Sequence, residues 1–221
     1  MGNFEIITFD CYGTLIDWEA GIVNAYQAAA SAEQVELNAG QIIDAYAAEE
    51  ATVEAMSYRP YRDVLTETER RAAAILRWRV PAESVGFLAD SLPSWKPFPD
   101  TNPALERLSR RFKLGILSNI DDDLLTATRR HFTVDFDLIV TAQQVSSYKP
   151  GLAHFKEAKL RMGDMRLVHA AQSYFHDVVP ATQMSIPVVW VNRKNNQIDP
   201  GGPSPTHQVR DLTELANYLG V

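Results

Sequence analysis

Cysteine is almost absent from this chain of 221 residues: Cys11 is the only one. An internal disulfide is therefore excluded, and a reducing compartment is the simplest expectation. No stretch approaches the roughly 18 apolar residues that a membrane helix needs. The amino terminus also lacks the basic start and apolar core of a signal peptide. We therefore expect a cytoplasmic protein with no membrane partner.

Basic residues are missing from the first part of the chain. Residues 1–58 contain ten of the 28 acidic residues and none of the 21 lysines and arginines. Because residues 1–58 lack lysine and arginine, any cation at an active site must come from beyond residue 58. The formal net charge of −7 argues against a nucleic-acid partner.

The composition is otherwise ordinary for a soluble globular protein, with 46% hydrophobic and 22% charged residues. Residues 18–98 have a helical apolar pattern, with Tyr46 and Val53 on one stripe, and no alternating strand pattern interrupts it. We expect a helical insertion over 17–98 within a core of 1–16 and 99–221. Insertions placed after a catalytic strand commonly act as lids that exclude water.

The core has the alternating strand and helix pattern of a doubly wound parallel sheet. Short apolar runs predict strands, and amphipathic or capped segments predict helices between them. The strands are expected at 4–9, 114–117, 138–140, 167–170 and 187–191, and helices at 102–111, from Asp121, from Pro150 and over 211–219. Pro150 suits a first helical position, and Asp121, Asp122 and Asp123 suit the first turn of a helix.

Asp10 directly follows the first buried run, and Gly13 then permits a sharp turn. Ligands of open α/β sheets bind at the carboxyl ends of the strands. A carboxylate there, with the Thr14 hydroxyl within reach, is a candidate covalent nucleophile. The alternative is that Asp10 only caps a turn, as aspartates often do.

Other strand ends supply suitable partners for Asp10. Ser118 and Asn119 end the second strand, Asp177 follows the fourth, and Lys149 arrives on a loop at the same edge. Lys149 would keep Asp10 ionised, and Ser118 and Asn119 would donate hydrogen bonds to a small anionic substrate or a leaving group. Asp177 would orient Lys149 or activate water. Of the five histidines, we expect only His176 near this site, and not as a catalyst.

Four motifs resemble those of the haloacid dehalogenase superfamily of hydrolases, in order and over essentially the whole chain. They are Phe9-Asp10-Cys11-Tyr12-Gly13-Thr14-Leu15, Leu117-Ser118-Asn119, Tyr148-Lys149-Pro150 and the segment from Gln172 to Asp177. The resemblance implies a Rossmann-like core, with three α/β/α layers and a helical cap inserted after the first strand.

Phosphatases of this superfamily carry a second aspartate where this chain has Tyr12. They also bind Mg²⁺ through an acidic fourth motif, in which Gln172 stands at the first of those positions. If a metal is bound, Asp10 and Asp177 would hold it. Both departures count against a Mg²⁺-dependent small-molecule phosphatase, which stays as the alternative.

The L-2-haloacid dehalogenases have a tyrosine at the position of Tyr12 and need no cofactor. The resemblance implies attack by Asp10 on the halogen-bearing carbon of a 2-haloacid, an ester on Asp10, and hydrolysis by water near Lys149 and Asp177. It assigns substrate contacts to the following residues: Cys11, Tyr12, Thr14, Ser118, Asn119 and Tyr174.

The chain also departs from this branch. The early cap lacks the halide-binding arginine, so that Arg59 or Arg62 would have to replace it, and Phe155 replaces a tyrosine. Gln172 and Tyr174 replace a serine and an asparagine. A non-catalytic relative is a third hypothesis. The substrate, its stereochemistry, the metal dependence and a homodimer through exposed cap residues all stay open.

Overall fold

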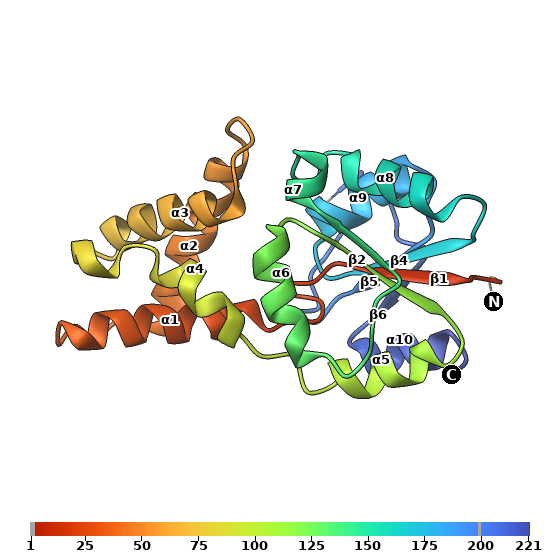
Figure 1. Cartoon of the computed structure of the whole chain (residues 1–221), viewed down its shortest axis with the longest axis horizontal. Coiled ribbons are helices and arrows are strands. Elements are labelled where there is room, and N and C mark those ends of the chain that lie inside the picture. Colours follow the sequence, from red (N-terminus) through yellow and green to blue (C-terminus); the bar gives the residue numbers. More distant parts are fainter. Residues whose placement is uncertain (1–2, 199) are drawn as a thin grey trace. The chain divides into compact units, whose positions relative to one another are not determined.

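The computed structural model describes residues 3–198 and 200–221 (Figure 1). The chain forms two compact units, which are described separately. The first contains the residues up to Asp17, Pro97–Asn119 and Arg130–Val221, and the second contains Trp18–Lys96 and Ile120–Arg129.

The first unit contains a six-stranded sheet in the order β3-β2-β1-β4-β5-β6, in which every neighbouring pair is parallel. The strands are β1 Ile6–Phe9, β2 Lys113–Ser118, β3 Leu138–Thr141, β4 Leu167–Ala171, β5 Val188–Val191 and β6 His207–Val209. This is the strand order of a Rossmann-like doubly wound sheet, so the predicted fold class is confirmed.

Helices cover both faces of this sheet. They are α5 Thr101–Ser109, α7 Ala142–Val145, α8 Ala153–Met162, α9 Val179–Gln183 and α10 Leu212–Tyr218. Figure 1 shows α5 and α10 on one face and α7, α8 and α9 on the other. Phe155 of α8 and Ala181 of α9 pack with Leu117, Val140 and Trp190 in one buried cluster. This apolar cluster holds the layer of α8 and α9 against the sheet.

The strand order places a topological switch point between β1 and β4. The chain proceeds from β1 to β2 and β3 on one side and returns to β4 on the other. Phe9, the last residue of β1, pairs with Ile116 of β2 and Ala170 of β4. Asp10 therefore leaves the sheet at the place where ligands of such folds bind.

Two local predictions for this unit were wrong. Strand β6 was not expected, because only one of its three residues, Val209, is buried and there is no apolar run to detect. Pro150 is not the first residue of a helix. Helix α8 begins at Ala153, and Pro150 follows a cis peptide bond in the preceding turn.

The second unit is helical. Its elements are α1 Trp18–Ala32, α2 Ala39–Glu54, α3 Tyr61–Ile75, α4 Phe87–Ser91 and α6 Asp122–Thr128, with 3₁₀ turns at Ala82–Ser84 and Leu92–Ser94. The ring of Tyr26 packs edge-on against Trp78 and Phe87, with centroids 6.2 and 4.9 Å away. Tyr46 and Val53 are buried, in agreement with their predicted place in the core of the insertion.

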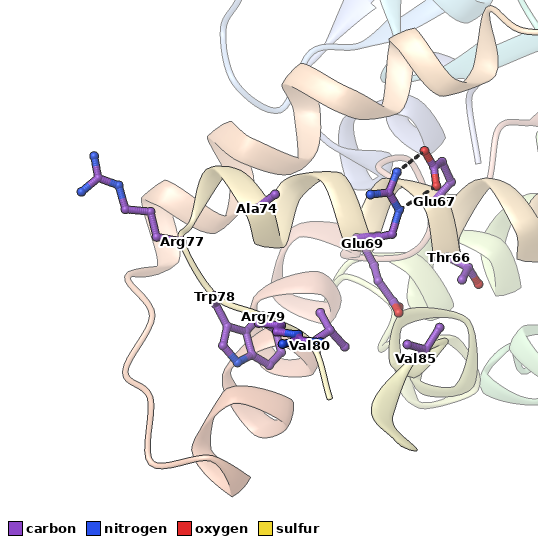
Figure 2. A pocket seen from close by; sticks show the side chains of 10 residues that line it. Thr66, Glu67, Glu69, Ala74, Arg77, Trp78, Arg79, Val80 and Val85 are labelled. Atoms are coloured by element: carbon purple, nitrogen blue, oxygen red, sulfur yellow. Dashed lines mark hydrogen bonds and ion pairs between the residues drawn. The ribbon is translucent and has the colours of Figure 1, made fainter. Parts of the chain in front are cut away.

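A pocket of about 520 Å³ opens within the second unit (Figure 2). The buried Glu69 lines it and accepts hydrogen bonds from the N–H groups of Gly86, at 2.6 Å, and Leu88, at 3.2 Å. Burial raises the pKa of Glu69, and these two donors only partly offset the effect. Glu67 and Arg70 also line the pocket and form an ion pair at 2.8 Å.

Asp121 joins helix α6 to helix α3. It is the amino-terminal cap residue of α6, as its sequence position predicts, but its side chain makes no hydrogen bond to that helix. Its two carboxylate oxygens instead accept the N–H groups of Tyr61 and Arg62, each at 2.9 Å. The segment 120–129 therefore packs with the helical unit, whereas the expected boundaries assigned it to the core.

Across residues 3–198 and 200–221, we find no helix with both the length and the apolar character needed to cross a membrane.

Candidate active site

Asp10 lies just beyond β1 and is 7% exposed. Its N–H donates to the carbonyl of Ala170 at 3.2 Å. Each carboxylate oxygen has one donor: Lys149 Nζ lies 2.9 Å from Oδ1, and Thr14 Oγ1 lies 2.8 Å from Oδ2. Gly13 makes the turn between Asp10 and Thr14 with φ of 95°, which is a left-handed conformation that glycine adopts without strain.

The direction of the Thr14 hydrogen bond follows from its second partner. The N–H of Gln172 donates to Thr14 Oγ1 at 2.9 Å, so the hydroxyl proton is free to point to Asp10 Oδ2. The carbonyl of Gln172 accepts the indole N–H of Trp190 at 2.8 Å. Gln172 thus connects the segment after β4 to the Asp10 turn through its backbone.

Lys149 connects the two predicted catalytic carboxylates. Its Nζ donates to Asp10 Oδ1 at 2.9 Å, to Asp177 Oδ1 at 2.7 Å and to the carbonyl of Leu117 at 2.9 Å. These three bonds use all three N–H donors of the ammonium group. The side chain is 2% exposed, so the network is shielded from water.

Asn119 fixes the backbone of Lys149. Its Oδ1 accepts the N–H of Lys149 at 2.7 Å, and its Nδ2 donates to the carbonyl of Lys149 at 3.0 Å. Asn119 was predicted to bind substrate or leaving group directly. The structure shows that it holds the backbone of Lys149 and keeps one amide hydrogen for another acceptor, so a direct contact with substrate or leaving group stays a prediction.

Burial and charge act differently on the two carboxylates. Burial raises the pKa of Asp10, and Lys149 and Thr14 only partly offset it. Burial also opposes ionisation of Asp177, but Lys149 and His169 outweigh it and hold the pKa of Asp177 well below its usual range. In the resting site, Asp177 is therefore the ionised partner of Lys149. Asp10 is the more basic carboxylate of the two, which suits a nucleophile.

The sequence interpretation missed His169, and the expectation that only His176 lies near the site was wrong. Strand β4 buries His169, whose Nε2 lies 3.0 Å from Asp177 Oδ1 and whose Nδ1 lies 2.9 Å from Thr8 Oγ1. The sequence did contain a signal for His169, which is a polar side chain inside an apolar strand. Such a buried group needs a buried hydrogen-bond partner. The ring of His176 hydrogen-bonds instead with Ser173 Oγ at 3.1 Å.

A second buried histidine supports Ser118. Nε2 of His154 lies 3.1 Å from the Ser118 carbonyl and donates to it. Burial, followed by the charge of Lys149, lowers the pKa of His154 to about 3, so this ring is neutral. Ser118 Oγ is itself buried and has no hydrogen-bond partner among the described residues, which makes it a donor available to a bound anion.

The structure gives other predicted contact residues different surroundings. The Tyr174 hydroxyl donates to the Pro203 carbonyl at 2.7 Å, and its ring packs 5.4 Å from that of Trp190. Burial raises the pKa of the Cys11 thiol far above its usual value, so this side chain is an inert part of the core. Tyr12 is half-buried, and its backbone forms an isolated parallel β-bridge with Ile16. Substrate contacts by these residues stay predictions.

Both arginines considered for the halide have partners within the helical unit. Arg62 lies 3.0 Å from Asp123 and 3.5 Å from Asp90, and Arg59 lies 3.1 Å from the sulfur of Met56. A role for either arginine at the halide stays a prediction.

The donor set does not fit a metal ion. Within the described part of the chain, no group of three or more His, Cys, Asp or Glu side chains is arranged to hold one. Asp10 and Asp177 both form ion pairs with Lys149, which already neutralises part of their charge. A site of this kind supports covalent catalysis by a carboxylate without a Lewis acid.

Comparison with known proteins finds both a dehalogenase and a phosphatase among the similar sequences. The (S)-2-haloacid dehalogenase of Pseudomonas putida is 27% identical over 99% of this chain and 98% of its own length. The glyceraldehyde 3-phosphate phosphatase of Methanothermobacter thermautotrophicus is 28% identical over 74% of this chain and 75% of its own. The fold matches that of L-2-haloacid dehalogenase from Xanthobacter autotrophicus with chloropropionic acid covalently bound. The TM-score is 0.85 at 17% identity, covering 98% of each chain. A family model for haloacid dehalogenase-like hydrolases matches residues 4–169. This match covers well over half of the chain, which therefore belongs to the haloacid dehalogenase-like hydrolases.

Proposed function

We propose that this hydrolase is a metal-independent dehalogenase that acts on small 2-haloacids through an ester on Asp10. The observation that carries the proposal is the Asp10 carboxylate, which has a raised pKa and one donor on each oxygen at the switch point of the sheet. The Pseudomonas putida relative that spans the whole chain is an (S)-2-haloacid dehalogenase, which supports the same class of substrate.

The first step is an in-line displacement at carbon 2 of the substrate. An oxygen of Asp10 forms a bond to this carbon, and the carbon–halogen bond breaks so that halide leaves with the electron pair. Halide needs no proton to depart, which agrees with Tyr12 in place of the acid that a phosphatase would use. Ser118 Oγ, which lacks a partner among the described residues, would bind the substrate carboxylate.

The second step is hydrolysis of the ester. A water oxygen adds to the side-chain carbonyl carbon of Asp10, and the water proton goes to Asp177. The bond between that carbonyl carbon and the substrate oxygen then breaks, and the leaving oxygen takes up the proton. The 2-hydroxy acid is released. The second water proton, which remains on the new Asp10 carboxyl group, leaves to solvent and restores the Asp10 carboxylate. Oδ2 of Asp177 suits this task, because it is buried and has no partner in the described part of the chain.

The competing phosphatase function would need Mg²⁺. It is disfavoured because Tyr12 and Gln172 replace two acids that such enzymes use, and because the described side chains offer no cluster for a metal. An assay of both activities separates the two functions. Halide release from each enantiomer of 2-chloropropionate should be unaffected by a chelator. Release of phosphate from small phosphoesters that requires Mg²⁺ would instead establish the phosphatase.

The nucleophile is tested by Asp10→Asn. This variant keeps the size of the side chain, should fold normally as judged by circular dichroism, and should release no halide. Full activity without deamidation of Asn at this position would refute the role of Asp10.

The ester intermediate is tested by oxygen isotopes. In a single turnover in ¹⁸O-water with enzyme in excess, the label should enter the Asp10 carboxylate, which mass spectrometry of its peptide detects. The product of that turnover should contain none, because its new oxygen comes from Asp10. Label in the first product would show direct attack of water on carbon 2.

A further inference from the structure

We propose that His169 is a positioning residue for ester hydrolysis, which holds Asp177 in place while Asp10 is esterified. The inference rests on the proposed function and adds a role for the buried pair of Thr8 and His169. His169 contacts none of the atoms that react, and it acts through Asp177.

The geometry places a proton on Nε2 of His169. Thr8 and His169 lie opposite each other in the register of β1 and β4, and both are fully buried. Nε2 faces a carboxylate oxygen of Asp177, which only accepts, so Nε2 must be the donor at 3.0 Å. Nδ1 can then accept from the Thr8 hydroxyl at 2.9 Å. The ring of Phe155 meets the imidazole edge-on at 5.1 Å and restricts its plane.

Two donors therefore fix one oxygen of Asp177 and leave the other for water. Lys149 and His169 both donate to Oδ1, whereas Oδ2 has no partner among the described residues. Lys149 also binds Asp10, and esterification removes the negative charge that helps to hold Lys149 there. During the second step, His169 is the donor to Asp177 whose position does not depend on the state of Asp10.

The imidazole contacts of His169 bear on Asp177 and not on Asp10. The ring hydrogen-bonds with Thr8 and Asp177 and packs against Phe155, whereas the Asp10 carboxylate takes its hydrogen bonds from Lys149 and Thr14. Loss of the imidazole N–H should therefore slow ester hydrolysis and leave halide displacement nearly unchanged.

The test is rapid-quench kinetics of His169→Leu and His169→Gln with 2-chloropropionate. His169→Leu removes the donor to Asp177. We expect halide release in a burst equal to the enzyme concentration, followed by turnover about tenfold to a hundredfold slower than in the wild type. The ester on Asp10 should accumulate and be visible by mass spectrometry. His169→Gln presents an amide N–H at a similar reach and should restore most of the turnover.

Thr8 supplies a matched pair of controls. Thr8→Val removes the hydroxyl that hydrogen-bonds with Nδ1 of His169. It should also give a halide burst followed by slowed turnover, with a smaller loss of turnover than in His169→Leu. Thr8→Ser keeps the hydroxyl and should behave like the wild type. These variants also carry the test if His169→Leu does not fold, which circular dichroism would show.

The outcomes separate the two proposals. Suppose that the wild type releases halide from a 2-haloacid. If His169→Leu then slows the halide burst and the turnover equally, or changes neither, the positioning role alone is overturned. A wild type that releases no halide from any 2-haloacid would overturn the proposed function and this role together.

Discussion

Replacing Lys149 by methionine would test whether one cation stabilises the two buried carboxylates. Methionine keeps the apolar stem of the side chain, which is 2% exposed, and removes the ammonium group that binds Asp10, Asp177 and the Leu117 carbonyl. Removing one partner of a buried ion pair costs about 3–5 kcal/mol, because an uncompensated charge stays behind. A domain of ordinary stability has about 5–15 kcal/mol, so the variant should fold but be much weaker.

The dependence on pH identifies the cause of this loss. Without Lys149, the two neighbouring carboxylates repel each other, and the folded state binds a proton more readily than the unfolded chain does. Acidification from about pH 7 to about pH 5 should therefore destabilise the variant less than it destabilises the wild type. Adding Asp177→Asn removes one of the charges and should recover part of the loss at about pH 7.

The assay is urea unfolding followed by circular dichroism at both pH values. Lys156→Met is the matched control, because Lys156 is exposed on α8 and its loss should change the unfolding free energy by less than about 0.5 kcal/mol. The reasoning fails if Lys149→Met costs no more than this control, or if Asp177→Asn recovers nothing.

Two further predictions concern a helix cap and a buried histidine. Asp121→Ala removes both acceptors at the start of α3 and should lower the unfolding free energy by about 1 kcal/mol in urea titrations; an unchanged midpoint would show that these bonds contribute nothing. His154 is neutral when folded, with a pKa of about 3, and gains a proton more easily when unfolded. The stability it contributes is complete above the unfolded pKa of about 6.5 and decreases toward acid, so it should fall by about 2 kcal/mol between about pH 7 and about pH 5. His154→Gln keeps a donor for the Ser118 carbonyl and should remove this part of the acid sensitivity; equal pH profiles would contradict the assignment.

The sequence predicted those features that depend on the order of residues along the chain. Apolar runs located five of the six strands, and parallel strands must end at a common edge, so Asp10, Lys149 and Asp177 could be grouped from the sequence alone. Strand β6 was missed because an exposed edge strand of three residues has no apolar pattern.

Features that depend on which atoms meet across the fold could not be predicted in the same way. His169 is visible in the sequence as a polar residue in an apolar strand, but its partners Thr8 and Asp177 come from other elements. Asp121 has the position of a cap for its own helix, yet its carboxylate meets the start of α3, 60 residues earlier in the chain. Asn119 likewise satisfies the backbone of Lys149, because a loop that follows a strand end needs a partner for its buried polar groups.

The sharing of one lysine between two carboxylates has a consequence for substrate and product traffic. With Asp10 ionised, Asp10, Lys149 and Asp177 carry one excess negative charge, which esterification of Asp10 cancels. Under the proposed mechanism, hydrolysis restores that charge beside a newly formed 2-hydroxy acid, which is itself an anion. The resulting repulsion would help to expel the product. The same repulsion acts against the entering haloacid, so the enzyme needs a compensating cation, and the first lysine or arginine in the chain is Arg59.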